Sequence, residues 1–291
     1  MANIRNPYDL VTWLKYKVFH RPLRLRVTAN LKIGQPKLTV VFLHGIAATS
    51  DVWQKVIRQM ARQHELDDIR LISMDLLGFG KSPHANWFNY DYTEYNQALQ
   101  NTLEKLHITT PLVLAGHSMG GLIAANYAVH QPDRFDLKEL ILVSPPVLMP
   151  NELAKLPDRV YTRSYASLHR LAEDEPAIEV IARFIQRFSS FRSNYLKTTA
   201  FARSIDNIIL NRHNYQTFTK IRTPTLIIHG RFDPLVIGAN LARATRNNAK
   251  YLTMTNVLAH HDITSNKRVK IVNLLNQLSQ EIDKENQDET L

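Results

Sequence analysis

The chain has 291 residues, which is long enough for one large core or for one core that carries an inserted subdomain. Its apolar content of 44% and charged content of 21% are typical of a globular protein. No apolar run approaches the roughly 18 residues of a membrane-spanning helix, and the first residues lack the apolar stretch of a secretory signal. The absence of cysteine excludes a disulfide framework, a thiolate metal site and a cysteine nucleophile. We therefore expect a cytoplasmic protein.

The net charge of +10 is concentrated at one end of the chain. Residues 1–37 carry eight basic side chains and one acid, Asp9, so this segment alone holds +7. The rest of the chain carries only about +3, which is not the globally basic surface that nucleic-acid binding needs. We expect no nucleic-acid partner.

The first predicted element is a basic amphipathic helix. Asn6 has the side chain of a helix N-cap, and Pro7 suits the first helical position. An apolar stripe follows at helical spacing, made of Leu10, Trp13, Leu14 and Val18. We expect this stripe to pack on the body of the protein. The alternative is a weak contact of residues 6–26 with an anionic membrane surface.

Short apolar runs then alternate with helical patterns along the chain. Residues 23–27 alternate apolar and basic side chains, which is typical of an edge strand with one solvated face. Buried parallel strands are predicted at residues 38–43, 70–75, 111–115, 140–143, 225–228 and 251–254. Helices are predicted at residues 52–63, 93–106, 120–130, 237–246 and after 265. The alternation predicts an α/β protein with a mostly parallel, doubly wound sheet.

A serine nucleophile is predicted where one of these strands turns into a helix. Gly116 and Gly120 flank Ser118 at two residues on either side, in the pattern G-x-S-x-G. The turn from strand to helix is sharp and strains the serine backbone, so its neighbours must be small enough for the strand and helix to pass closely. Such a turn exposes the serine hydroxyl above the sheet edge, beside the positive end of the helix dipole. Residues 115–121 therefore indicate a nucleophile elbow.

With this elbow, the chain resembles an α/β-hydrolase of the serine hydrolase type over roughly residues 38–280. The resemblance implies a helical cap inserted over the active site, and residues 148–216, which lack a strand pattern, are its expected place. We accordingly expect a basic helix and edge strand in residues 1–30, two core parts in 31–147 and 217–285, and a tail in 286–291.

The resemblance also implies an oxyanion hole made of main-chain groups. His44 and Gly45 follow the first buried strand and match the family's His-Gly turn. The N–H groups of Ile46 and Met119 are the expected donors. We expect His44 itself to orient the turn rather than to transfer protons.

The remaining catalytic groups are expected after the last two strands, because catalytic residues collect at the carboxyl ends of parallel strands. Asp233 lies on a loop after residues 225–228 and is the expected acid. Two adjacent histidines follow residues 251–254. The family's small residue before its histidine favours His260 as the base, and His261 remains the alternative.

These residues predict a metal-free serine hydrolase that works through an acyl-enzyme, most simply a carboxylesterase for small or medium acyl esters. No cofactor is expected. One alternative is hydrolysis of carbon–carbon bonds in diketone-type acids, because the arginine-rich cap offers partners for a carboxylate. Another is a non-catalytic protein that binds small molecules on the same fold. The sequence does not indicate an oligomeric state.

Overall fold

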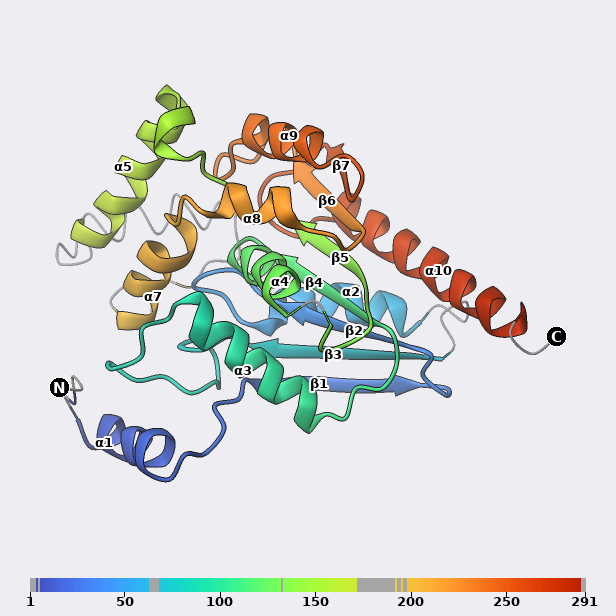
Figure 1. Ribbon diagram of the computed structural model, residues 1–291, viewed down its shortest axis with the longest axis horizontal. Helices are drawn as coiled ribbons and strands as arrows, with labels where there is room; N and C mark the ends of the chain where they lie inside the picture. The colour runs from blue at the N-terminus through green and yellow to red at the C-terminus, as the bar shows by residue number, and fades with distance from the viewer. Residues whose placement is uncertain are drawn as a thin grey trace.

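The computed structural model describes residues 4, 6–62, 68–131, 133–171, 192, 195 and 198–288. A sheet of seven strands runs through the molecule, in the order β1-β3-β2-β4-β5-β6-β7 (Figure 1). The strands are β1 (Arg26–Ile33), β2 (Leu38–Leu43), β3 (Ile69–Asp75), β4 (Leu112–His117), β5 (Leu137–Val143), β6 (Thr225–Gly230) and β7 (Leu252–Val257). Strand β1 is antiparallel to β3, and every other pair is parallel. The predicted α/β-hydrolase sheet is confirmed.

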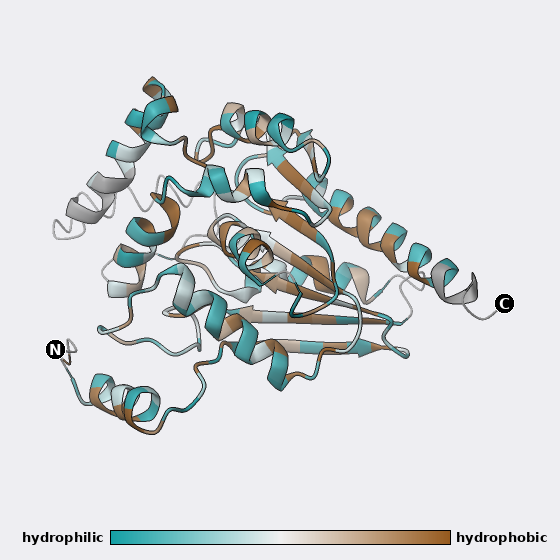
Figure 2. Ribbon diagram, in the orientation of Figure 1, coloured by the Kyte–Doolittle hydropathy of each residue, from teal (hydrophilic) through white to brown (hydrophobic). Residues whose placement is uncertain are grey.

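The central strands are apolar because both of their faces are covered. All residues of β2, β3 and β4 are buried, whereas β1 at the sheet edge has no fully buried residue. Figure 2 shows the same contrast as brown central strands and paler outer elements. Continuous apolar runs are typical of parallel strands between two helical layers, and this pattern is what made the strands predictable.

Helices cover both faces of the sheet. One face carries α3 (Tyr92–Lys105), α4 (Met119–His130), α8 (Asn214–Lys220) and α9 (Gly238–Asn247), which share one apolar cluster with the sheet. The other face carries α2 (Gln54–Met60), preceded by the 3₁₀ turn η2 (Ser50–Trp53), and α10 (Ser265–Asp288), which share a second cluster. Two cores separated by one sheet are the arrangement expected of a doubly wound fold.

Among its described residues, the segment between β5 and β6 contains helices and loops but no strand. Its elements are η4 (Asn151–Leu153), α5 (Leu156–Leu171), α7 (Thr199–Ser204), the π-helical turn η6 (Ile205–Ile209) and α8. Residues 172–191 of the expected cap lie outside the described residues, as do residues 289–291 of the expected tail. The domain boundaries, including the cap at residues 148–216, stay predictions.

The N-terminal helix α1 (Pro7–Trp13) begins as predicted but packs on the body with the opposite face. Asn6 caps it by accepting a hydrogen bond from the Asp9 N–H at 2.9 Å. Asp9 and Thr12 are the buried residues of α1, whereas Leu10 and Val18 of the predicted apolar stripe are 45% and 46% exposed. The expectation that the whole stripe packs on the body is wrong: polar contacts dock this helix, and of the stripe only Trp13 and Leu14 are half-buried.

None of the helices in the described part of the chain is both long and apolar enough to cross a membrane.

Candidate active site

Ser118 lies on the predicted elbow between β4 and α4. Its backbone has φ 52° and ψ −118°, a conformation that a side chain other than glycine rarely adopts. The Ser118 N–H donates to the Val143 carbonyl at 2.8 Å, which fixes the turn against the neighbouring strand β5. Ser118 is only 5% exposed, so the residue is buried just below the protein surface.

The glycines around Ser118 are required by close packing of main chain. A Cβ on Gly116 would lie 2.3 Å from the Gly120 carbonyl oxygen, and a Cβ on Gly120 would lie 2.5 Å from the carbonyl oxygens of Leu43 and His44. These distances are far below any van der Waals contact. The spacing of the two glycines around the serine therefore follows from the closeness of β4, α4 and the loop after β2.

The loop after β2 packs directly against the elbow. A Cβ on Gly45 would lie 3.1 Å from the Ser118 Cβ, so the main chain that leads into Ile46 passes beside the serine. Met119 is the first residue of α4, and the N–H groups of a helix's first turn have no acceptor within the helix. Main chain from two segments, the loop after β2 and the start of α4, thus borders Ser118.

His44 holds this loop in place. Its Nε2 accepts the Leu76 N–H at 2.8 Å, so the ring proton lies on Nδ1, which donates to the Gly45 carbonyl at 2.7 Å. Burial lowers the pKa of His44 to about 4, which keeps the ring neutral. Both ring nitrogens are occupied by main-chain partners, so His44 orients the loops after β2 and β3.

The structure pairs Asp233 with His261 and not with His260. The Nδ1 of His261 lies 2.9 Å and 3.0 Å from the two carboxylate oxygens of Asp233, and both residues are buried. His260 is exposed, and its Nδ1 lies 3.0 Å from the Phe232 carbonyl oxygen. The expectation that His260 faces the acid is therefore corrected in favour of the alternative, His261. Adjacent side chains of the loop after β7 point in different directions, and the second one reaches the carboxylate.

Asp233 is held in its ionised form. Burial by itself raises the pKa of this carboxyl, but His261, Lys267 and the Ser144 hydroxyl more than offset it and lower the pKa to about 2. The Leu235 N–H adds a hydrogen bond of 2.9 Å to the same carboxylate. A buried carboxylate with these partners is charged at neutral pH and can orient an imidazole.

His117 links the elbow to His261. Its Nε2 lies 3.0 Å from the His261 carbonyl oxygen, which can only accept, so this nitrogen carries the proton. The two imidazole rings lie 4.8 Å apart at an angle of 53°. Burial, together with the nearby His261 and Lys267, lowers the pKa of His117 well below its usual range. Because His117 immediately precedes Ser118, this contact places His261 beside the nucleophile elbow.

A buried lysine lies behind the acid–histidine pair. Lys267, on the first turn of α10, has no solvent exposure. Its Nζ donates to Ser144 Oγ at 2.9 Å, to the His260 carbonyl at 2.6 Å and to the His261 carbonyl at 2.8 Å. The Ser144 hydroxyl in turn hydrogen-bonds Asp233. All three ammonium protons are used, which makes the buried charge tolerable.

The sequence did not reveal the roles of His117, Ser144 and Lys267. Ser144 follows β5, and a serine followed by two prolines does not by itself mark a catalytic position. Lys267 stands in a basic run, Lys267 and Arg268, which by itself indicates only a solvated helix face. The role of Lys267 becomes visible only in the folded chain, where the start of α10 lies beside the end of β5.

The fold and the elbow define a serine hydrolase of the α/β-hydrolase class. The chain belongs to the family described as Hydrolase_4, serine aminopeptidase, S33, whose profile matches residues 34–263. It is therefore a hydrolase, as the sequence predicted, and the resemblance to α/β-hydrolases is confirmed.

Ester hydrolases are among the similar proteins. The chain is 28% identical to a pimeloyl-[acyl-carrier protein] methyl ester esterase of Legionella pneumophila (strain Corby), over 79% of this chain and 90% of that protein. It is 30% identical to "Probable lysophospholipase BODYGUARD 4" of Arabidopsis thaliana over 44% of this chain, which spans only 29% of that relative. An esterase from Exiguobacterium antarcticum has the same fold, with a TM-score of 0.67 at 21% identity and coverage of 89% and 95%.

Proposed function

We propose that the chain is a serine carboxylesterase in which Ser118 is the nucleophile, His261 the base and Asp233 the acid that orients it. The observation that supports this most is the pairing of His261 Nδ1 with both Asp233 oxygens, at 2.9 Å and 3.0 Å, beside the elbow. That pairing leaves Nε2 as the nitrogen for proton exchange with the serine. His260, the base favoured by the sequence, is replaced in this proposal.

The reaction proceeds through an acyl-enzyme. His261 Nε2 takes the Ser118 proton as the oxygen attacks the ester carbonyl, and Asp233 stabilises the imidazolium that forms. The N–H groups of Ile46 and Met119 stabilise the oxyanion, and one such donor is typically worth about 3 kcal/mol. His261 then protonates the leaving alcohol and activates the water that hydrolyses the acyl-enzyme. No step needs a metal or a cofactor.

The proposed substrate is a small or medium acyl ester. The similar protein from Legionella pneumophila is named for a methyl ester of a pimeloyl group, which is a medium acyl chain with a small alcohol. The alternative is hydrolysis of carbon–carbon bonds in diketone-type acids, for which the arginine-rich segment offers partners for a carboxylate. Arg203 and Arg212, which lie in that segment, instead donate to the carbonyls of Phe88 and Met149, and Arg192 pairs with Asp51. These three arginines are thus held by the protein itself, and the carbon–carbon alternative depends on the other arginines of the segment.

A panel of p-nitrophenyl esters of increasing acyl length, assayed beside a β-diketone acid, tests this proposal. We expect ester turnover with an optimum at a short or medium chain and no cleavage of the diketone. Turnover of the diketone acid alone would replace the esterase by a carbon–carbon hydrolase.

A further inference from the structure

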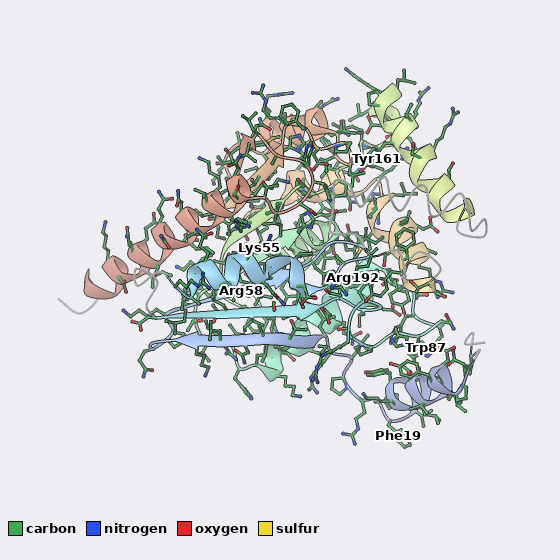
Figure 3. The ribbon with its side chains drawn as sticks, turned by 180° about the vertical axis from the view of Figure 1, so that it is seen from behind. Phe19, Lys55, Arg58, Trp87, Tyr161 and Arg192 are labelled. Carbon is green, nitrogen blue, oxygen red and sulfur yellow. The ribbon has the colours of Figure 1, made fainter. Side chains whose placement is uncertain are left out.

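The N-terminal helix presents an apolar face to solvent. Val11 and Phe19 are 62% and 68% exposed, and Leu10 and Val18 are nearly half exposed. Figure 3 shows Phe19 at the outer rim of the molecule, on the far side of the helix from Trp87. A surface helix normally buries such residues, so this face has no partner within the described part of the chain.

Polar contacts fix α1 in this orientation. The Asp9 carboxylate accepts the main-chain N–H of Asn86 at 2.8 Å and its side-chain amide at 2.9 Å. Trp87 Nε1 donates to the Asp9 carbonyl at 3.2 Å, and the ring of Tyr8 stacks on His84 at 4.4 Å. The polar side of the helix is therefore the docked side, and the apolar side cannot also turn inward.

A π-helical turn extends the apolar face. In η1 (Leu14–Val18) the Phe19 N–H donates to the Leu14 carbonyl at 2.9 Å, which is the i→i+5 hydrogen bond of a π-helix. Together they line a surface hollow of about 430 Å³, whose other lining residues are Val11, Lys15 and Arg21. Apolar and cationic groups thus share one hollow.

The segment that forms this face carries only basic charges beyond Asp9. From Leu10 to Ser50 the chain contains no acidic residue, and Asp9 is turned inward onto Asn86. Lys15 and Lys17 lie over the rings of Tyr16 and Trp87, at 5.0 Å and 5.6 Å. Within the described residues neither ammonium forms a salt bridge. Glu94 is close enough to Lys17 to interact with its charge, whereas Lys15 lines the hollow and is available to an external anion.

We propose that α1 and η1 form a membrane-docking surface, made of Leu10, Val11, Leu14, Lys15, Lys17, Val18, Phe19 and Arg21, that binds an anionic phospholipid bilayer. Apolar side chains enter the headgroup region while basic ones contact lipid phosphates, which is how an amphipathic helix lies in a membrane interface. The charge selects an anionic bilayer over a second copy of this chain, because two equally basic faces repel each other.

Docking would turn the carboxyl ends of the parallel strands, where Ser118 lies, toward the bilayer. Figure 1 shows α1 and α7 at the end of the molecule toward which β2 and β3 point. Asn86 joins the two helices, since it binds Asp9 on one side and accepts the Thr199 hydroxyl at 2.7 Å on the other. The surface is independent of the proposed esterase chemistry, and it can be tested without an activity assay.

Co-sedimentation of the full chain with vesicles tests the proposal. We expect binding to phosphatidylcholine vesicles that contain phosphatidylglycerol, weaker binding to phosphatidylcholine alone, and loss of binding in high salt. The double variant Val11→Ser/Phe19→Ser should lower the partition coefficient by about tenfold or more. Lys15→Glu/Lys17→Glu should lower it by at least about tenfold.

Matched variants elsewhere separate this surface from general adhesion. Val269→Ser removes an apolar residue that is 47% exposed on α10, and Lys55→Glu/Arg58→Glu makes the same charge change on α2. Figure 3 shows Lys55 and Arg58 well away from Phe19. Both controls should bind within about twofold of the parent. Equal losses in the controls would overturn the proposal.

A second readout needs no variant. Brominated lipids should quench the fluorescence of Trp13, which lies on α1, because a bound helix brings this ring to the headgroup level. Trp53 is fully buried in the core and serves as the unquenched background. Absence of both sedimentation and quenching would overturn the proposal. So would a concentration-dependent dimer that Val11→Ser/Phe19→Ser abolishes, since the face would then belong to a second copy.

Discussion

The ammonium group of Lys267 donates a hydrogen bond of 2.8 Å to the main-chain carbonyl of His261. His117 Nε2 lies 3.0 Å from the same oxygen, so both lone pairs of this carbonyl are occupied by buried donors. The position of the proposed base is thus fixed through its main chain by one residue from α10 and one from β4, while Asp233 fixes its ring.

Replacement of Lys267 should therefore affect the rate more than substrate binding. Lys267→Met keeps the length of the side chain but removes the hydrogen bonds to Ser144, His260 and His261. We expect kcat to fall by about ten- to hundredfold with little change in KM. Lys270→Met, an exposed change on the same helix, is the control. Burial lowers the pKa of Lys267 to about 8, so the parent should also lose activity above that pH as one N–H donor is lost.

The pH profile distinguishes this role from a structural one. Lys267→Met should show its low rate at every pH and lack the decline near pH 8 that the parent shows. An identical decline in both proteins would assign that ionisation to another group.

The two adjacent histidines should differ sharply in importance. His261→Ala removes the proposed base and should reduce kcat by about 10⁴-fold or more, because triad members act as a unit. His260→Ala should cost less than about tenfold, since this exposed ring faces the Phe232 carbonyl and not the acid. Steady-state kinetics on p-nitrophenyl butyrate measures both. The reverse order would return the role of base to His260.

Two adjacent glycines at the elbow, Gly120 and Gly121, should differ in how much an alanine substitution lowers the free energy of unfolding. An alanine Cβ at Gly120 would lie 2.5 Å from two main-chain oxygens, and Gly120→Ala should lower the free energy of unfolding by about 3 kcal/mol. At Gly121 the nearest atom is 3.1 Å away, and the gain in helix propensity of about 1 kcal/mol offsets much of the strain. Urea unfolding of the two variants should show this difference, and similar losses would contradict the packing account.

Acid should weaken the protein partly through Asp233. Its pKa is about 2 in the folded protein, below the ordinary value of 3.8, so its ionised form contributes stability above about pH 4 that is lost as the pH falls toward 2. The shift corresponds to about 2 kcal/mol. The difference in free energy of unfolding between the parent and Asp233→Asn should therefore shrink between pH 7 and pH 3. A constant difference would show that Asp233 does not gain its partners on folding.

The sheet and the elbow could be predicted because each depends on local sequence. Buried strands need apolar runs, and the crowded turn at Ser118 needs glycine at Gly116 and Gly120. Asp233 was also expected, from its place after a strand. The choice between His260 and His261 depends on the direction of two neighbouring side chains in one loop, and no periodic pattern encodes that direction.

The buried lysine and the orientation of α1 could not be predicted for a different reason. Lys267 meets Ser144 across 123 residues of sequence, so its role exists only in the folded chain. The apolar stripe of α1 suggested burial, but the contact of Asp9 with Asn86, 77 residues away, docks the opposite side. Periodicity identifies an amphipathic face and does not say what covers it.

Labelling with a fluorophosphonate, followed by intact mass, tests the central proposal most directly. We expect stoichiometric labelling of the parent at Ser118, none in Ser118→Ala, near-normal labelling in His260→Ala, and labelling slowed by several orders of magnitude in His261→Ala. Labelling that persists in Ser118→Ala, or that is slowed in His260→Ala but not in His261→Ala, would contradict the proposed triad of Ser118, His261 and Asp233.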